Sequence, residues 1–180
     1  IYILVPDTLL ALQKLASHKR NLIEYPVIGI TGTYGKTNVK EWLISILETT
    51  FKVGKSTGSY NSQIGVALSI LHLSLDFEIA VIEAGISQSG EMENLERMIR
   101  PDYGILTHMG DVHNEGFSSF ENKMKEKLIL FKNSKMVWCL YQDYIYAKNY
   151  FNTSKLFAIG LNQNASIQLN WTATPGATKY

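Results

Sequence analysis

A short glycine-containing segment near the N-terminus has the residue types that bind phosphate. In "GITGTYGKTN", Gly32 and Gly35 allow a tight turn that exposes backbone N–H groups, and a helix expected to begin near Lys36 directs its positive end at that turn. Lys36 adds a cation for the outer phosphates of a nucleotide, and the Thr37 hydroxyl is placed to ligate magnesium. The segment therefore predicts an anion-binding loop.

This segment departs from the most common phosphate-binding pattern. The pattern G-x-x-x-x-G-K-[ST] requires a glycine at position 30, where the chain has Ile30. Two interpretations stay open on these residues alone: a plain glycine turn, or a phosphate loop of another kind. The apolar run before the segment and the amphipathic run after it favour the second, because a phosphate loop joins a strand to a helix.

Polar residues also follow two other apolar segments. Glu83 ends the run "AVIE", and the loop "THMGDVHNEGF" carries His108, Asp111, His113 and Glu115. Ligands of open parallel sheets bind at the carboxyl ends of the strands, where a carboxylate can hold magnesium. By itself, Glu83 is equally well a structural carboxylate, and each histidine can be a hydrogen-bonded loop residue.

Two further segments have both a functional and a structural interpretation. The polar loop "KSTGSYNSQIG" is long enough to serve a site, or it is a solvated connection. In "ENKMKEKL", the lysines Lys123, Lys125 and Lys127 are by default an exposed helix face. Their spacing alone singles out none of them.

The composition indicates an ordinary globular protein. Of the 180 residues 46% are hydrophobic, and the formal net charge is +1, so we expect one main domain and neither nucleic acid nor a membrane as partner. The single cysteine, Cys139, excludes an internal disulfide and suits a reducing compartment, so we expect a cytoplasmic protein. The opening run "IYILVPDTLL" is too short to span a bilayer and lacks the basic flank of a signal peptide.

The elements expected around these residues alternate between strand and helix. Strands are expected at 25–30, 51–53, 78–85, 103–110, 135–140 and 155–160, and helices at 7–19, 35–50, 65–73, 90–100, 119–131 and 143–151. This order predicts an α/β fold with a parallel sheet flanked by helices. The tail at 165–180 changes to period-two alternation, which predicts a short antiparallel β extension at the C-terminus.

Together these segments resemble the central ATPase domain of the Mur ligases, the ATP-dependent amide-forming enzymes of peptidoglycan precursor synthesis. The phosphate loop of that family reads T-G-T-x-G-K-T, which residues 31–37 match without a glycine at position 30. The segments that carry the resemblance are "PVIGITGTYGKTNVKEWL", "SYNSQIGVALS", "AVIEAGISQSGEMENLE", "RPDYGILTHMGDVHNEGF" and "ENKMKEKLILF". The resemblance implies a P-loop NTPase-like central ATP-binding domain at 25–180, incomplete at its C-terminal end, after an interdomain linker and leading helix at 1–24.

The resemblance also implies roles for individual residues. The phosphates of ATP would be held by Lys36 and the loop around it, namely Gly32, Thr33, Tyr34, Gly35, Thr37 and Asn38. Magnesium would lie between Thr37 and Glu83, and a second magnesium ion on His113. Lys127 would be carbamylated by carbon dioxide, because a carbamate is an anionic oxygen ligand whereas an ammonium repels a metal. Lys36, His113 and Lys127 form the implied catalytic group.

The loop residues Asn61 and Ser62 would lie near the γ-phosphate and the substrate. Three positions depart from the family pattern: Tyr34 and Ser62 each replace an asparagine, and Ile129 replaces an acid after Lys127. We expect Tyr34 to be tolerated, because backbone N–H groups grip the phosphates.

The branch of the family that the chain resembles adds D-Ala-D-Ala to UDP-N-acetylmuramoyl-tripeptide through an acyl phosphate. Both substrates would bind through domains that this sequence does not contain. The runs "KEWL", "YNSQIG" and "KEKLILF" further resemble ligases that are fused to an alanine racemase domain. Three alternatives stay open: a folylpolyglutamate synthase-like ligase, whose loop tends to read G-T-N-G-K-G-S, a non-catalytic nucleotide-binding module, and a structural domain with an inactive loop.

Overall fold

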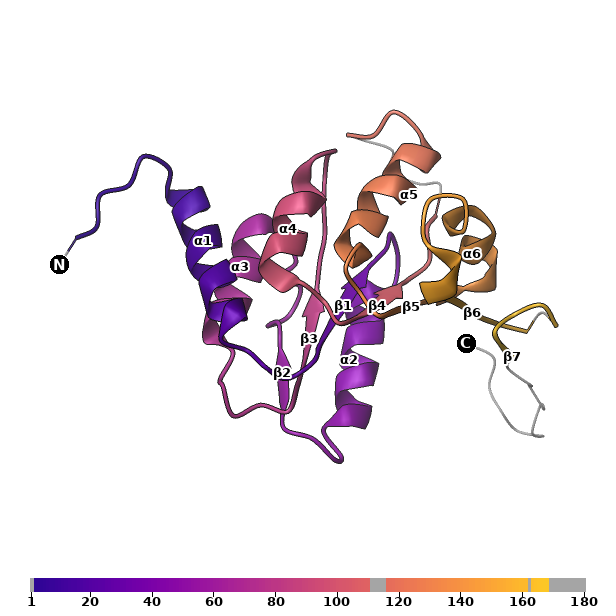
Figure 1. Ribbon diagram of the computed structural model, residues 1–180, viewed down its shortest axis with the longest axis horizontal. Helices are drawn as coiled ribbons and strands as arrows, with labels where there is room; N and C mark the ends of the chain where they lie inside the picture. The colour runs from indigo at the N-terminus through magenta and orange to yellow at the C-terminus, as the bar shows by residue number, and fades with distance from the viewer. Residues whose placement is uncertain (1, 111–115, 162, 169–180) are drawn as a thin grey trace.

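A parallel sheet runs through the molecule and carries helices on both faces (Figure 1). The computed structural model describes residues 2–110, 116–161 and 163–168. Its strands are β1 (Val27–Thr31), β2 (Val53–Lys55), β3 (Ile79–Glu83), β4 (Tyr103–Leu106), β5 (Met136–Leu140), β6 (Leu156–Gly160) and β7 (Ile167–Gln168). Its helices are α1 (Thr8–Asn21), α2 (Lys36–Leu47), α3 (Gln63–His72), α4 (Glu91–Ile99), α5 (Phe120–Leu128) and α6 (Tyr141–Ala147), with 3-10 turns at Ile129–Phe131 and Thr153–Lys155.

The order of the strands brings three loops to one place. The sheet has the order β2-β3-β1-β4-β5-β6-β7, and all its neighbouring strands are parallel. Because β1 lies between β3 and β4, Ile30 is level with Glu83 on one side and with Ile105 on the other. The loops that leave the carboxyl ends of these strands therefore meet at the edge where α/β sheets bind ligands.

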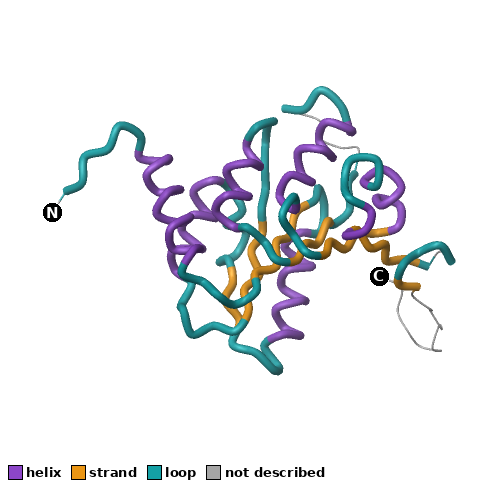
Figure 2. Tube along the Cα trace, in the orientation of Figure 1, coloured by secondary structure: helices purple, strands orange, loops and turns teal. Residues whose placement is uncertain are grey.

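Two apolar cores hold the helices on the sheet. α2 lies alone on one face, and α1, α3, α4, α5 and α6 lie on the other (Figures 1 and 2). On the α2 side, Ile44 packs with Ile30 and Val81, and all three are buried. Away from this contact, Leu43 and Trp138 border an apolar hollow of about 670 Å³. Coverage on both faces near β1 explains why the inner strands are almost wholly apolar in sequence.

A buried arginine fixes α1 to the rest of the molecule. Arg20 is 7% exposed. Its guanidinium donates to the carbonyl oxygens of Ile23, Ile99 and Arg100 at 3.0, 2.7 and 2.9 Å, and to the carboxylate of Asp102 at 3.2 Å. The leading helix therefore packs directly on the predicted ATP-binding domain, and the division between the two at residue 24 stays a prediction.

The last described strand corrects the prediction of an antiparallel extension. β7 pairs with β6 in parallel, with Ile167 level with Ile159. Alternation along a strand indicates which side chains share a face, but the direction of the strand depends on the path of the preceding loop. Residues 169–180 of the predicted extension lie outside the described residues.

The helix ends differ from the sequence-based expectation by a few residues. α5 ends at Leu128, and the three residues after it form a 3-10 turn rather than continuing the helix. α6 begins at Tyr141, two residues earlier than expected. Such differences are usual, because helix ends fray and the last turn is often 3-10. Within the described ranges, the helices are all too short or too polar to cross a membrane.

Candidate functional site

The predicted phosphate loop joins β1 to α2, and its two glycines have backbone conformations that other residues rarely adopt. Gly32 has a φ of +149°, and a Cβ there would lie 2.0 Å from the hydroxyl oxygen of Thr107. Gly35 has a φ of +78° and is the N-cap residue of α2. Glycine at these positions lets the chain pass from the end of β1 directly into the helix.

The backbone N–H groups of this loop form two sets. Those of Thr33 and Tyr34 donate to the carbonyl oxygen of His108, at 3.0 and 3.1 Å, and attach the loop to the segment after β4. The first turn of α2, residues 36–38, has no side-chain cap from its N-cap residue Gly35. Because the first N–H groups of a helix have no acceptor within the helix, this turn presents donors that are free among the described residues, together with a positive dipole end. Such a helix start is suited to binding an anion.

Three of the predicted site residues lie together where β1 and β3 end. The Thr37 hydroxyl donates to Oε2 of Glu83 at 2.9 Å, and the side-chain amide of Asn61 donates to Oε1 of Glu83 at 2.7 Å. Glu83 is fully buried. A buried carboxylate is costly unless it is hydrogen-bonded, and these two bonds satisfy one lone pair on each oxygen.

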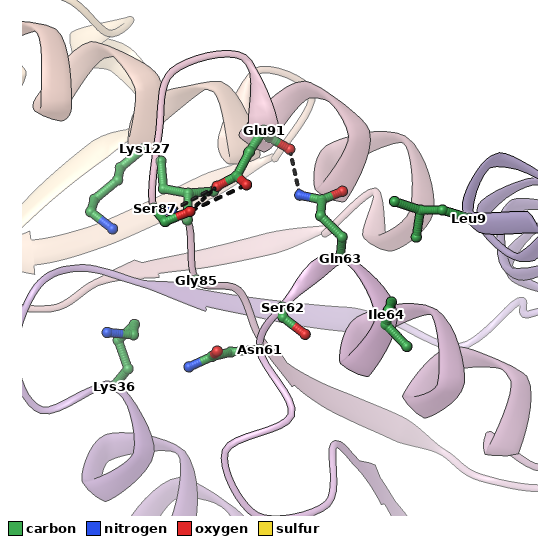
Figure 3. Close-up of a pocket in the computed structure, with 11 residues that line it drawn as sticks. Leu9, Lys36, Asn61, Ser62, Gln63, Ile64, Gly85, Ser87, Glu91 and Lys127 are labelled. Atoms are coloured by element: carbon green, nitrogen blue, oxygen red, sulfur yellow. Dashed lines mark hydrogen bonds between the residues drawn. The ribbon is translucent and has the colours of Figure 1, made fainter. Parts of the chain in front are cut away.

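A cavity of about 440 Å³ opens beside this group of residues. Figure 3 shows Lys36 and Lys127 pointing toward the same part of the cavity, with Asn61 beside Lys36. The ammonium of Lys36 also donates to the carbonyl oxygen of Thr33 at 3.1 Å, so this side chain folds back over its own loop. The cavity therefore brings together the phosphate loop, the loop after β2 and helix α5.

Another part of the cavity wall is fixed by local hydrogen bonds. The Ser62 hydroxyl accepts a hydrogen bond from the N–H of Gly65 at 3.2 Å, which makes Ser62 the N-cap of α3. The Glu91 carboxylate accepts hydrogen bonds from the N–H and the hydroxyl of Ser87, at 2.6 and 3.1 Å. These hydrogen bonds fix the side chains of this part of the wall.

Burial lowers the pKa of both lysines that face the cavity. Lys127 is 3% exposed, and burial together with the charges of Lys36 and Lys123 lowers its pKa to about 7, against a smaller opposite effect of Glu126. The pKa of Lys36 is lowered by burial, and Glu83 partly opposes this. An anion in the cavity would favour the charged form of both lysines, so the electrostatics indicate a negatively charged ligand.

The comparison with protein families agrees with this geometry. The family model of the Mur ligase middle domain matches residues 30–179. The chain belongs to the Mur ligase middle domain family. This Mur ligase domain is 38% identical over 133 residues to the UDP-N-acetylmuramoyl-tripeptide–D-alanyl-D-alanine ligase of Bacillus subtilis, over 74% of the chain and 29% of the relative. The chain thus spans about three tenths of the length of that curated relative.

Solved structures confirm the predicted fold of a Mur ligase central domain. The MurF ligase of Thermotoga maritima in complex with ADP superposes with a TM-score of 0.81 at 30% identity, over 97% of this chain and 42% of that protein. The folylpolyglutamate synthetase of Helicobacter pylori superposes with a TM-score of 0.57 at 16% identity, over 82% of this chain and 47% of that protein. The second likeness is one of fold alone.

The loop after β4 of this Mur ligase domain is described only in part. His113, the predicted metal ligand, belongs to residues 111–115, which lie outside the described residues. His108 is described, and its Nδ1 lies 3.3 Å from the carboxylate of Asp143, which also accepts the N–H of Met109 at 3.1 Å. Burial raises the pKa of Asp143. These contacts support the structural interpretation of His108, as a residue that holds the loop in place.

The lysines of α5 have different surroundings. Lys125 lies on the exposed side, with its ammonium 4.7 Å from the centre of the Tyr150 ring. Lys123 and Lys127 are 4% and 3% exposed, so the default interpretation as an exposed helix face is wrong for these two. The spacing of the three lysines offered no means of separating them, and only the family resemblance singled out Lys127.

Lys40 is a buried residue near the site that the sequence reasoning missed. Its exposed fraction is 0%, and its ammonium lies 3.9 Å from the carboxylate of Glu83. A signal was available, because Lys40 follows Lys36 by four residues and Thr37 by three, and residues with these spacings share a helix face.

Proposed function

We propose that the protein containing this chain is an ATP-dependent ligase that joins D-Ala-D-Ala to UDP-N-acetylmuramoyl-tripeptide. The observation that carries the proposal is the pairing of Thr37 with Glu83 at 2.9 Å, directly beside Lys36 at the start of α2. The name of the Bacillus subtilis relative supports the choice of substrates, and the ADP complex of the Thermotoga maritima ligase supports a nucleotide in this domain. In this proposal the chain is the nucleotide-binding part of the enzyme.

The phosphates of ATP bind to the free N–H groups of residues 36–38 and to the ammonium of Lys36. Gly32, Thr33, Tyr34 and Gly35 shape the loop, although the N–H groups of Thr33 and Tyr34 are already bonded to His108. Phosphoryl transfer depends on position and charge balance more than on covalent help from the protein. The positive charge of the Lys36 ammonium offsets the negative charge that shifts between the phosphates during the transfer.

The residues present also fit magnesium. Thr37 and Glu83 offer a hydroxyl and a carboxylate, which are the hard oxygen ligands that magnesium prefers. In the described part of the chain, no group of three histidine, cysteine, aspartate or glutamate side chains could hold a metal alone. This suits an ion that takes its other ligands from phosphate and water. When bound, magnesium neutralises charge on the phosphates.

Lys127 is the proposed site of carbamylation. Carbon dioxide reacts with a neutral amine, and a pKa of about 7 leaves a large neutral fraction of Lys127 near neutral pH. The amine nitrogen bonds to the carbon of carbon dioxide and loses a proton, which converts the neutral amine into an anionic oxygen ligand. On the basis of the family resemblance, His113 is proposed to bind a second magnesium ion.

The proposed reaction begins with transfer of the γ-phosphate to the terminal carboxylate of the tripeptide. The amine of D-Ala-D-Ala then attacks the acyl carbon, and phosphate leaves. Asn61 and Ser62 are proposed to lie along the substrate side, since both line the cavity with Lys36 and Lys127. A fused alanine racemase stays a prediction. The cytoplasm is the proposed location, which the single buried cysteine Cys139 suits.

Phosphate release by the full-length protein tests this proposal. The assay contains ATP, magnesium and UDP-N-acetylmuramoyl-tripeptide, with and without D-Ala-D-Ala. We expect phosphate release that requires the dipeptide, together with a pentapeptide product. Release with another acceptor would instead indicate a sister ligase, and nucleotide binding without any release would indicate a non-catalytic nucleotide-binding module.

A further inference from the structure

Lys40 occupies a position that lysine rarely takes. It lies in the second turn of α2 with an exposed fraction of 0%, although lysine usually keeps its ammonium in water even when its stem is buried. Burying an ammonium is costly unless it is paired and hydrogen-bonded. The contacts of this side chain therefore show what keeps it inside.

The ammonium of Lys40 has a partner for each of its three N–H groups. It donates to the carbonyl oxygen of Ser56 at 3.3 Å and to the carbonyl oxygen of Gly58, and it forms an ion pair with the carboxylate of Glu41 at 3.1 Å. An ammonium offers three donors and no acceptor, so these partners satisfy it. Two of the three are backbone atoms of the loop between β2 and α3.

That loop, residues 56–62, ends at the nucleotide site. Its Asn61 donates to Glu83 at 2.7 Å, and the carbonyl oxygen of Asn61 accepts the N–H of Gly85 at 2.8 Å. Glu83 in turn holds the hydroxyl of Thr37, which lies on α2 three residues before Lys40. A closed circuit of contacts thus runs from α2 through Lys40 to the loop, then to Glu83 and back to α2.

We propose that Lys40 is a positioning residue for the nucleotide site. Its ammonium holds the 56–62 loop against α2, so that Asn61 stays hydrogen-bonded to Glu83 and Glu83 keeps its orientation toward Thr37. The positioning of the 56–62 loop by Lys40 is inferred from the structure alone, whereas the effect of Lys40 on catalysis rests on the proposed function.

The contacts distinguish this role from two simpler ones. As a mere counter-charge, Lys40 would be expected closest to Glu83, but its ammonium is 3.9 Å from that carboxylate and nearer to Ser56 and Glu41. As a mere space-filling residue, it could be replaced by methionine without loss, because methionine has a similar length and no charge. The two loop carbonyls are the contacts that only a donor can make.

Hydrogen exchange on the full-length protein tests the positioning directly. In Lys40→Met, amide exchange at residues 56–62 should be at least about tenfold faster than in the wild type, because the loop loses two charge-assisted hydrogen bonds. The matched control is Val137→Ala, which creates a cavity in the buried strand β5, away from the loop. Each protein is measured the same number of degrees below its own melting midpoint. Under these conditions Val137→Ala should change amide exchange at 56–62 by less than about twofold relative to the wild type.

Kinetics supply the second readout. The ammonium of Lys40 contacts the 56–62 loop and Glu41 rather than Lys36. Lys40→Met should therefore lower kcat for phosphate release at least about tenfold and change KM for ATP less than about threefold. Equal exchange at 56–62 in Lys40→Met and Val137→Ala would overturn the proposal, and so would a kcat equal to that of the control. If the wild type releases no phosphate, the proposed function fails, and the exchange comparison alone still decides the role of Lys40.

Discussion

The side chain of Lys127 lies in a nearly closed position beside two other lysines, and this placement controls its protonation. Its pKa is lowered from the ordinary value of 10.5 to about 7, mainly by burial. Between those pH values the unfolded chain holds a proton on Lys127 that the folded chain lacks. Stability therefore rises with pH over this range, and the full cost of the buried charge is present below about pH 7.

This pH dependence can be measured by urea unfolding in buffers free of carbon dioxide. Lys127→Met removes the buried charge, so it should stabilise the protein more at pH 6.5 than at pH 9.5, by a difference on the order of 3 kcal/mol. Leu128→Met, at the next buried position of α5, is the control and should have the same effect at both pH values. Equal effects of Lys127→Met at the two pH values would contradict the lowered pKa.

The proposed carbamate has its own test. Lys127→Ala leaves a space next to Lys36, and a short carboxylic acid in that space would restore an anionic oxygen group. We expect acetate to recover part of the phosphate release that the substitution removes, on the order of tenfold above the variant without acetate. Absence of recovery over a wide range of acetate concentrations would count against a carbamate at this position.

The sequence indicated some of these contacts and not others. Thr37 and Glu83 could be placed together through the family resemblance, and the structure brings them together because one begins the helix after β1 and the other ends the neighbouring strand β3. Lys40 and Arg20 could not, because a helical repeat shows which residues share a face but not that a charged side chain will turn inward. The acceptors that hold these two residues come from distant parts of the chain.

At the scale of elements, the turn from β1 into α2 depends on the absence of a side chain at Gly32. A Cβ there would overlap the Thr107 hydroxyl oxygen at 2.0 Å and approach its carbonyl oxygen at 2.8 Å. Gly32→Ala should therefore displace the loop and weaken ADP binding at least about tenfold. Calorimetric titration of the full-length protein with ADP and magnesium measures the change.

The control for this substitution is Gly90→Ala. Gly90 also has a positive φ, of +89°, but a Cβ there meets no atom of the described residues within 4 Å. It should cause comparable backbone strain while leaving ADP affinity within about twofold of the wild type. If Gly32→Ala were equally harmless to binding, the turn from β1 into α2 would not depend on the absence of a side chain at position 32.

Helix α1 packs on α3 and α4, and the buried side chain of Arg20 anchors its C-terminal end. Arg20 has four acceptors, three of them carbonyl oxygens, and Arg20→Met would remove the donor from all four. We expect a loss of about 3 kcal/mol or more in unfolding free energy. Arg97→Met, which removes an exposed pair with Glu93, should cost less than about 0.5 kcal/mol. Similar losses for both arginines would contradict the anchoring role of Arg20.

The elements themselves were largely predictable, with one instructive error. Continuous apolar runs of four to five residues between helical repeats predicted β1, β3, β4, β5 and β6, because strands covered on both faces have this pattern. The direction of β7 was not predictable, since Ile167 and Gln168 pair with β6 through backbone atoms that any two residues provide.

At the scale of the whole molecule, the fold places the start of α2, the end of β3 and the inner face of α5 around one cavity. Strands that are distant in sequence become neighbours because β1 is inserted between β3 and β4. The sequence could predict the alternation of elements but not the volume of the cavity or the inward orientation of Lys127. Both depend on packing between elements rather than on any single segment.

In the proposed function, this cavity holds the phosphates of a nucleotide. Calorimetric titration of the protein with ADP and magnesium tests that binding directly. The full-length wild type is compared with Lys36→Ala and with the exposed control Lys55→Ala, whose side chain pairs only with Glu48 among the described residues. Loss of a charge-assisted contact to phosphate predicts at least about tenfold weaker binding in Lys36→Ala and unchanged binding in the control. ADP binding that is equally tight in all three proteins would contradict the nucleotide site proposed for this chain.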